Sequence, residues 1–340
     1  MDRELTERQQ AVLGMIVSEY VATATPVGSD TIVRKYCPGV SAATVRNDMV
    51  TLASAGYVYL PHTSAGRVPS DEGYRYYVRH LMQPTDLTPE ERRMIDHLFH
   101  QIERDLGQWM QLAASVLAQF TGHASIVTLP VVRQSRLRHL DLIATQDRSA
   151  IVLALLGEGT VHQQLLIQSE PLTQAELDEV ARRLTVALRG RTADEIAAWD
   201  EVRSPLDRVV RDCLVDLMRK ADRQAVPGVW HAGVSSLLAQ PEFVRSEKAK
   251  EILSAFEQPS LAVELADAML EHPGVRVMIG DEIPWSVLRD CAVVGTRYGT
   301  GTSGGAIALI GPTRMRYDRA IAIIHYLGEV MTNLWAELCG

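Results

Sequence analysis

The sequence predicts a multidomain protein of the α+β class, and three observations lead to this fold class. The first 82 residues have the pattern of three short helices followed by a strand, a loop and a returning strand. Strand patterns at 125–167 give way to helical patterns at 172–268, and strands return at 275–310, which suggests an α/β sensor-like domain with a helical insertion. The length of 340 residues suffices for two or three domains.

The composition is that of a globular, acidic protein. There are 34 Lys and Arg against 42 Asp and Glu, a formal net charge of −8, and 46% of residues are hydrophobic. Proteins that coat nucleic acids are usually strongly basic, so contact with DNA here requires a local positive patch. The N-terminus is polar, the longest apolar run (Ala150–Leu156) is too short to cross a bilayer, and the four cysteines form no C-x-x-C pair. We therefore expect a cytoplasmic protein with reduced cysteines and no membrane contact.

Helix boundaries in the first 82 residues are marked by capping residues. Thr6 and Gln9 form a capping box before the first helix, Ser29 caps a second helix that Pro38 and Gly39 break, and Ser41 caps a third that ends at Gly56. The run Tyr57–Leu60 predicts a strand, a loop follows, the chain returns at Val68, and a helix covers 71–82. This order is typical of a winged helix-turn-helix.

The third helix presents small and polar side chains on its outer face. A rotation of about 100° per residue directs Val45, Met49, Leu52 and Ala53 to the domain core and Ala43, Asn47, Val50 and Thr51 away from it. Small side chains allow close approach to a major groove, and Arg and Asn can pair with guanine and adenine edges. From this helix we expect the following residues to contact DNA: Ser41, Ala42, Ala43, Thr44, Arg46 and Asn47. The alternative is that Arg46 pairs with Asp48 or a nearby Glu, and that Asn47 is merely solvated.

The loop after the first strand supports DNA binding. It offers hydrogen-bond donors, small residues and one cation, and we expect five of its members to contact DNA: His62, Thr63, Ser64, Gly66 and Arg67. Such a wing can lie along the phosphate backbone or insert Arg67 into the minor groove. Residues 1–30 carry two basic and five acidic side chains, whereas residues 31–82 carry six basic and three acidic ones. Positive charge therefore gathers where DNA is expected to lie.

Helix and strand signals continue through the rest of the chain. Thr88, Pro89 and Glu91 start a long helix whose apolar stripe runs to Phe120, although Gly107 interrupts it. That stripe can pack within its own domain or on a partner helix. We expect strands at the following ranges: 125–129, 137–144, 150–156, 161–167, 275–280, 291–298 and 306–310. A final helix is expected at 317–338.

Other motifs in the sequence do not indicate catalysis or cofactor binding. The stretch Gly299–Gly304 matches G-x-G-x-x-G, but a strand rather than a helix follows it, so we interpret it as a hairpin turn. His97 and His100 lack the carboxylates that would complete a metal site, and no nucleophile elbow or P-loop is present. We expect no enzyme activity, no metal and no cofactor.

The chain resembles the heat-inducible transcription repressor family HrcA. The resemblance rests on SAATVRNDMVTLASAGYV, PHTSAGRVPSDEGYRYYV and, near the C-terminus, GPTRMRYDRAI. It implies a homodimer that binds an inverted-repeat operator, called CIRCE, upstream of chaperone operons, and a repressor kept active by the chaperonin GroEL. It also implies a GAF-like domain interrupted by a mostly helical dimerisation insertion.

The expected domain boundaries follow from these patterns and the resemblance. They are a winged helix-turn-helix at 1–82, a linker and helix start at 83–104, a discontinuous GAF-like domain at 105–170 and 263–340, and an inserted dimerisation domain at 171–262. Two other functions remain open. One is a regulator whose GAF-like domain binds a small molecule, and the other is an enzyme with a DNA-binding domain, which lacks a catalytic constellation.

Overall fold

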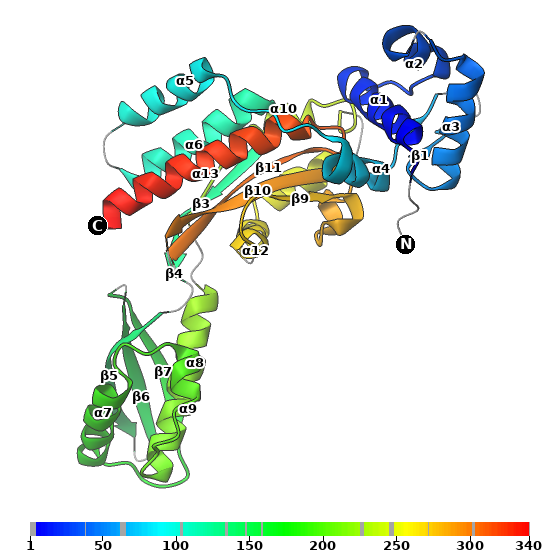
Figure 1. The fold of residues 1–340 in the computed structure, drawn as a ribbon. Helices are drawn as coiled ribbons and strands as arrows, with labels where there is room; N and C mark the ends of the chain where they lie inside the picture. The colour runs from blue at the N-terminus through cyan, green and yellow to red at the C-terminus, as the bar shows by residue number, and fades with distance from the viewer. Residues whose placement is uncertain are drawn as a thin grey trace. The chain divides into compact units, whose positions relative to one another are not determined.

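The protein forms a mixed α/β structure of two compact units (Figure 1). This computed structural model describes residues 5–37, 39–61, 66–102, 105–132, 135–146, 148–157, 159–224, 228–244, 248–270, 272–300 and 303–339. The first unit comprises Met1–Leu129, Gly228–Gly299 and Gly305–Gly340, and the second comprises Pro130–Pro227 and Thr300–Gly304. Within the described ranges, no helix is long and apolar enough to span a bilayer.

These units place the inserted segment differently from the sequence prediction. We expected an insertion at 171–262 and assigned the strands at 137–167 to the GAF-like domain. The structure instead groups those strands with the helices that follow them, and residues 228–299 and 305–340 belong to the first unit. The physical reason is that alternate apolar residues of the strands at 137–167 share one buried cluster with the helices at 174–224.

The N-terminal module, residues 5–82, contains three helices and a small hairpin. The helices are α1 (Glu7–Thr23), α2 (Ser29–Tyr36) and α3 (Ala42–Ser54), and the hairpin pairs β1 (Val58–Tyr59) with β2 (Val68–Pro69). Ser70 caps α4 (Asp71–Tyr76), which continues as a π-helical turn at Tyr77–Leu81. Side chains of α1 form the centre of the module, with Leu13, Ile16 and Val17 fully buried.

The long helix predicted from Pro89 to Phe120 is two helices. The first, α5 (Pro89–His100), begins with the predicted capping box of Thr88 and Glu91, and the second, α6 (Leu106–Thr121), begins with its own cap at Asp105. The Asp105 carboxylate accepts a hydrogen bond from the N–H of Gln108 at 2.7 Å. A side-chain cap at this position stabilises the start of a new helix. The apolar stripe therefore runs through both helices, although the helix itself is interrupted between them.

A twisted sheet forms the centre of the first unit. Its strand order is β8-β3-β11-β10-β9. The strands are β3 (Ala124–Thr128), β8 (Val229–Ala232), β9 (Arg276–Ile279), β10 (Cys291–Thr300) and β11 (Ser303–Pro312). The pairs β9–β10, β3–β11 and β3–β8 are antiparallel. The strand β8 lies inside the range that was expected to be helical.

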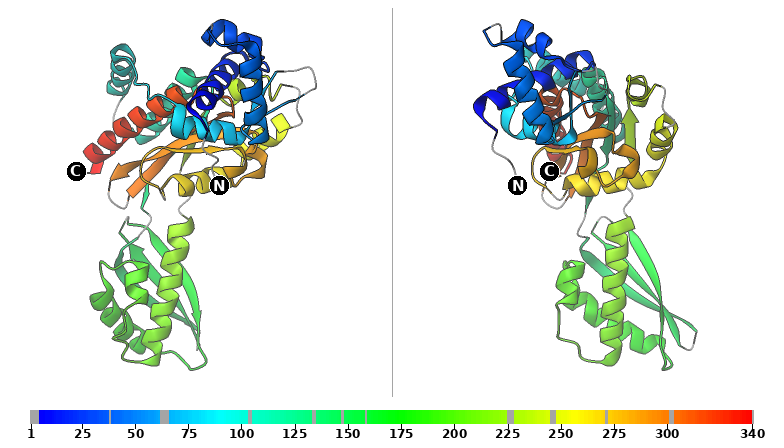
Figure 2. Two further views of the ribbon diagram at one scale, coloured as in Figure 1. Left: turned by 45° about the vertical axis from the view of Figure 1, so that its right-hand side comes forward. Right: turned by 90° about the vertical axis from the view of Figure 1, so that its right-hand side faces the viewer.

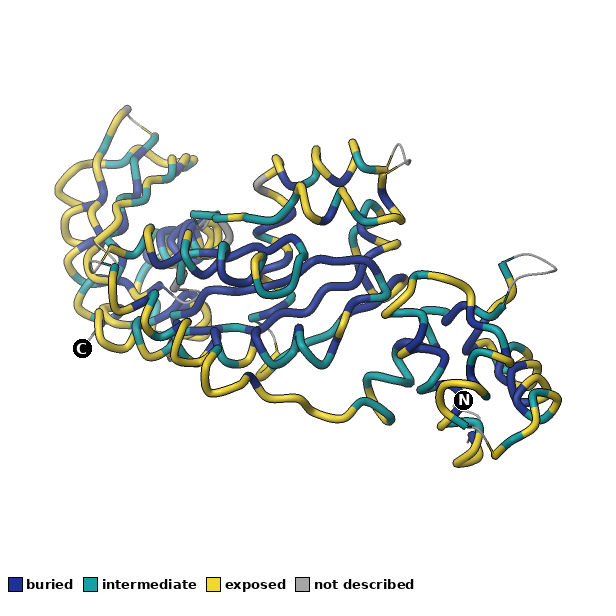
Figure 3. Tube along the Cα trace, turned by 90° about the horizontal axis from the view of Figure 1, so that it is seen from above, coloured by how far each residue is buried: buried dark blue, intermediate teal, exposed yellow. Residues whose placement is uncertain are grey.

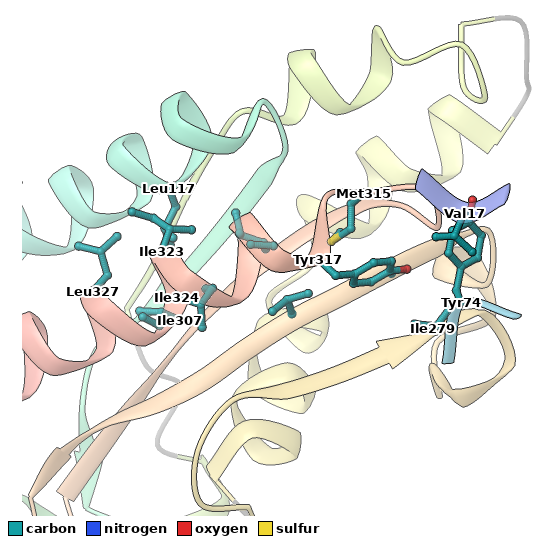
Figure 4. Packing of buried hydrophobic residues seen from close by; sticks show 14 of the residues in the cluster. Val17, Tyr74, Leu117, Ile279, Ile307, Met315, Tyr317, Ile323, Ile324 and Leu327 are labelled. Atoms are coloured by element: carbon teal, nitrogen blue, oxygen red, sulfur yellow. The ribbon is translucent and has the colours of Figure 1, made fainter. Parts of the chain in front are cut away.

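Helices cover both faces of this sheet. On one face lie α6 and α13 (Tyr317–Cys339), where Leu117 lies beside Ile323 and Ile324 lies beside Ile307 of the sheet, all in one buried cluster (Figure 4). The other face is covered by α11 (Lys248–Phe256) and α12 (Pro259–Leu270). Short helical segments complete the unit: α10 (Val234–Leu238), Gly280–Glu282 and Ser286–Leu288. Burial follows the layers, with the strands buried and the outer helix surfaces exposed (Figure 3).

The second unit is a three-stranded antiparallel sheet with helices on one face (Figure 2). Its strands are β5 (Leu137–Gln146), β6 (Ser149–Leu156) and β7 (Val161–Ile167), and its helices are α7 (Gln174–Leu188), α8 (Ala193–Ala197) and α9 (Pro205–Gln224). The short strand β4 (Val131–Val132) pairs with Ser303 and Gly304. Alternate residues of β6, namely Ala150, Val152, Ala154 and Leu156, are buried with the helices.

The opposite face of the three-stranded sheet is open and carries several exposed apolar side chains, together with Asp141 and Gln163 in the row of Leu153. The strand register aligns Ile143, Ile151 and Leu165 in one cross-strand row, and Leu155 faces Val161 in another. The exposed fractions are 45% for Ile143, 57% for Leu165, 64% for Val161 and 72% for Ile167. We call this surface, formed by Ile143, Ile151, Leu155, Val161, Leu165 and Ile167, the open sheet face.

Candidate nucleic-acid interface

The N-terminal half of α3 presents the outer face that its sequence predicts. Val45, Met49 and Leu52 are buried in the module core, and Ala53 is half-buried. Exposed residues are Ala43, Arg46, Asn47, Val50 and Thr51, while Ala42 and Thr44 are half-buried. The exposed stripe therefore combines small side chains with one guanidinium and one amide.

The start of α3 is fixed by its own cap. Ser41 is exposed, and its Oγ accepts a hydrogen bond from the N–H of Thr44 at 3.1 Å. The two hydroxyl oxygens also lie 2.9 Å apart. Ser41 and Thr44 therefore stabilise the helix end, which leaves Ala43, Arg46 and Asn47 as its outward groups.

Asp48 pairs with Arg8 and not with Arg46. The Arg8 guanidinium of α1 donates two hydrogen bonds to the Asp48 carboxylate, at 2.8 Å and 3.0 Å. Only 4% of the Asp48 side chain is exposed. This bidentate pair ties α3 to α1, and the expected alternative, in which Asp48 neutralises Arg46, does not occur.

The sequence contained a signal for this pair that the prediction did not use. Asp48 lies three residues after Val45 and four before Leu52, so helical spacing places its carboxylate on the buried side of α3. A buried carboxylate requires a cation or several hydrogen-bond donors. Its partner could not be identified from sequence, since Arg8 is forty residues away.

Arg46 extends toward the start of α2. Its Nη2 donates to the Ser29 Oγ at 3.5 Å, the single hydrogen bond described for this guanidinium. Ser29 is the first residue of α2 and is buried. Because this contact is long and engages one of five donors, the remaining guanidinium N–H groups can pair with a base edge or a phosphate.

A buried carboxylate joins α1 to α2. Glu19 accepts hydrogen bonds from the Lys35 ammonium at 2.6 Å and from the Tyr36 hydroxyl at 3.0 Å. The bond from Lys35 lowers the pKa of the Glu19 carboxyl, although its burial opposes this effect. With the Arg8–Asp48 pair, this contact fixes α1 against both α2 and α3.

The end of the loop predicted as a wing is anchored to the connection between α1 and α2. Val27 and Arg67 exchange two backbone hydrogen bonds of 2.8 Å. At Gly66 any Cβ would lie 2.4 Å from the carbonyl carbon and oxygen of Val27, so this close approach requires glycine. The Arg67 Nε is buried without a hydrogen-bond partner among the described residues. The predicted wing residues His62, Thr63 and Ser64 lie outside the described residues.

Two of the predicted DNA-contacting residues, Arg46 of α3 and Arg67 of the loop, both contact the segment 27–29 between α1 and α2. Arg67 pairs through its backbone with Val27, and Arg46 contacts Ser29 two residues later. Between these residues Gly28 occupies the N-cap of α2. The connection 27–29 therefore sets the position of the wing base relative to α3.

Two further features that the sequence singled out can be compared with the described residues. Of the stretch Gly299–Gly304, the first two residues end β10 and the last two begin β11, so a strand follows it as predicted, while residues 301 and 302 of the predicted turn lie outside the described residues. No group of three His, Cys, Asp or Glu side chains within the described ranges could hold a metal ion.

Comparisons with known proteins place the chain in one family. Residues 107–321 match the family described as HrcA protein C terminal domain. The protein named heat-inducible transcription repressor HrcA in Roseiflexus sp. (strain RS-1) is 38% identical to this chain, over 100% of this chain and 97% of that protein. The protein of the same name in Chloroflexus aurantiacus is also 38% identical, over 99% of this chain and 96% of that protein. The HrcA of Thermomicrobium roseum is 37% identical over 100% of this chain and 98% of that protein.

A solved structure supports the fold. The crystal structure of a hypothetical protein at 2.2 Å resolution is similar over 98% of both chains, with a TM-score of 0.58 and 26% sequence identity. The family match covers more than half of the chain, and the named repressors are similar to it over nearly its whole length. The chain therefore belongs to the HrcA family of heat-inducible transcription repressors.

Proposed function

We propose that the N-terminal module is a winged helix-turn-helix that binds double-stranded DNA, with α3 in the major groove and the 62–67 loop as the wing. One observation carries this proposal. The N-terminal half of α3 exposes Ala43, Arg46 and Asn47, while its neighbours in the helix anchor it to the core and to α1. Small side chains, a helix N-terminus and two bidentate-capable groups suit a major groove.

Operator binding by the purified full-length chain tests this proposal. Fluorescence anisotropy at physiological salt would compare a labelled inverted-repeat duplex with a scrambled duplex of the same composition. Specific binding requires an affinity for the inverted repeat at least about 1,000-fold higher than for the scrambled duplex. Equal affinities would refute sequence-specific binding.

We propose further that the chain acts as a homodimer through the second unit. The open sheet face supports this, because four of its apolar side chains are between 45% and 72% exposed. Several exposed apolar side chains on one face are typical of protein interfaces. A two-fold dimer presents two copies of α3, which matches an inverted repeat whose half-sites are separated by about one helical turn or a multiple of it.

The proposed operator is the CIRCE inverted repeat upstream of chaperone operons, and the proposed modulator is the chaperonin GroEL. Both assignments rest on family membership, as does the GAF-like character of the central sheet and its helices. The direct test is operator binding across temperature, with and without chaperonin. Loss of binding by the isolated repressor on mild heating, reversed on cooling and unaffected by chaperonin, would contradict chaperonin control.

A further inference from the structure

A cleft lies between the N-terminal module and the central sheet domain, within the first unit. Its volume is about 620 Å³, which lies in the range of small-molecule sites. One wall comes from the module, through Tyr20 of α1, Tyr59 of β1 and Asp71 of α4. The other comes from the sheet domain, through Lys248 of α11 and Arg289 and Asp290, which follow the short helix Ser286–Leu288.

The floor of the cleft contains an unsatisfied hydroxyl. Val68, Pro69 and Tyr74 line it and are buried, and Tyr74 is only 1% exposed. The Tyr74 hydroxyl has no hydrogen-bond partner among the described residues. Its ring lies between α1 and the sheet domain, near Val17 and Ile279 (Figure 4). An unpaired buried hydroxyl costs free energy, so a partner molecule in the cleft would gain by satisfying it.

Most charges on the rim neutralise one another. The Lys248 ammonium pairs with the Asp290 carboxylate, and the Arg314 guanidinium pairs with Glu242 at 2.5 Å. Two charged groups remain for a ligand. Arg289 is exposed and has no side-chain partner described in the structure. Asp71 is half-buried on the opposite wall, where burial raises the pKa of its carboxyl; this carboxylate accepts a hydrogen bond from the Asp281 backbone and keeps further acceptor positions for a ligand.

This charge arrangement excludes several ligand classes. The lining carries three carboxylates, those of Asp71, Glu242 and Asp290, against the two cations of Lys248 and Arg289, so it has no surplus of positive charge to hold a phosphate ester or another dianion. A purely apolar molecule would leave Arg289 and the Tyr74 hydroxyl unused. A molecule with one cationic and one anionic group fits both walls.

We infer that this cleft binds a small zwitterion of the amino-acid type. Arg289 pairs with its carboxylate, Asp71 with its ammonium, and its side chain reaches Val68, Pro69 and the Tyr74 hydroxyl on the floor. A guanidinium binds a carboxylate through two parallel N–H donors, which gives such a site its orientation. The cleft lies beside the central sheet and not within its core.

Binding at this position has a consequence for the N-terminal module, and this consequence rests on the proposed function. A ligand that contacts both walls stabilises the arrangement in which they face each other. Ligands shift a conformational equilibrium only by their difference in affinity for the two states. We therefore expect the bound zwitterion to change operator affinity, because it fixes the module that carries α3.

The test uses the full-length chain and the twenty free L-amino acids as probes. Thermal unfolding would be followed with each amino acid at about 10 mM, and isothermal calorimetry would measure the affinity of any that stabilises. A dissociation constant of about 1 mM predicts a rise in Tm of about 3 °C. The absence of a shift or of binding heat for every amino acid would overturn the inference and leave DNA binding unaffected.

Two substitutions and a control locate the site. Arg289→Ala should weaken binding of the active amino acid at least about tenfold, because a charged hydrogen bond is lost. Tyr74→Phe should weaken binding while leaving the Tm of the free chain unchanged or slightly higher, since it removes an unpaired hydroxyl. Arg182→Ala, at an exposed position on α7 of the second unit, should change neither. Unaltered affinity in both cleft variants would place the ligand elsewhere and refute this assignment.

The regulatory consequence has a separate readout. Operator affinity would be measured with and without a saturating concentration of the active amino acid, for the wild-type chain and for Arg289→Ala. A change of about fivefold or more in the wild type that is lost in the variant supports the coupling. Equal operator affinities would refute the coupling, and binding of the amino acid would still stand on the calorimetry.

Discussion

Two exposed faces of this chain differ in chemistry. On the N-terminal half of α3 the outward residues are small or polar, and Arg46 and Asn47 are the largest polar groups there. On the open sheet face they are branched and apolar, with Ile167 72% exposed. Each face is backed by a buried cluster that holds its helix or strands in place. The exposed side chains of the two faces therefore indicate different partners.

The difference shows how each partner would be recognised. The groups on α3 retain hydrogen-bonding capacity because their neighbours carry the packing, as when Asp48 turns inward to Arg8. The six side chains that define the open sheet face cannot form hydrogen bonds, so they gain free energy only when another apolar surface removes them from water. The first face suits a nucleic acid, and the second suits a protein.

The largest expected effect comes from a charge on the open sheet face. Leu165→Lys would place an ammonium at the end of the row that it forms with Ile143 and Ile151, and should raise the dimer dissociation constant about 100-fold or more. Sedimentation equilibrium measures the dimer dissociation constant. The matched control is Val186→Lys on α7, an exposed apolar residue of the same unit that lies outside this face. A dimer that tolerates Leu165→Lys would show that the interface is elsewhere.

The second effect sharpens the function of α3. Arg46→Ala should weaken operator binding by about 1–3 kcal/mol and relax the base preference at one position of each half-site. Arg46→Lys keeps the positive charge but loses the two parallel N–H donors of the guanidinium. Compared with Arg46→Ala, it should therefore restore much of the operator affinity but little of the base preference. Competition with a set of single-base operator variants measures both quantities. An unchanged preference profile in Arg46→Ala would mean that Arg46 contacts only phosphate or solvent.

A third effect separates the wing from the helix. Arg67→Ala should weaken binding about threefold to tenfold for all duplexes alike and reduce the slope of log affinity against log salt concentration by about 1. Because Arg67 pairs with Val27 through its backbone, the wing base should keep its position in this variant. Titrations at several salt concentrations test this. A loss confined to one operator base would instead assign Arg67 to base readout.

The smallest effect concerns the pair that positions α3. Arg8→Ala leaves the Asp48 carboxylate buried without its cation, so Tm should fall and operator binding should weaken roughly two- to fivefold. Since Arg8 acts through Asp48, the base preference should not change. Arg8→Lys retains the charge and should restore part of the loss. A changed base preference in Arg8→Ala would show that Arg8 itself contacts DNA.

Local sequence was sufficient to predict most helix starts and several strand positions. The capping boxes of Thr6 with Gln9 and of Thr88 with Glu91 are both present. These signals are local, because a side chain three residues away satisfies the first free N–H groups of a helix. The rotation of α3 was equally predictable, since helical spacing alone determines which residues share a face.

Other features required the tertiary structure. The strands β5–β7 have the same alternating pattern as strands of the central sheet, so the sequence could not show that they pair only with each other. The start of a second helix at Asp105 was hidden by an apolar stripe that continues through it. Strand β8 lies in a stretch with helical composition and pairs with the edge of β3, a contact over about a hundred residues of chain.

The sequence alone determined the kinds of groups that α3 and the wing offer, because side-chain identity and helical period are local properties. Only the tertiary structure decided which of these groups are free. Asp48 meets Arg8 forty residues away, Arg67 pairs with Val27, and the cleft at Tyr74 forms where two parts of the chain come together. Contacts between distant residues depend on how packed elements meet, and no local pattern encodes them.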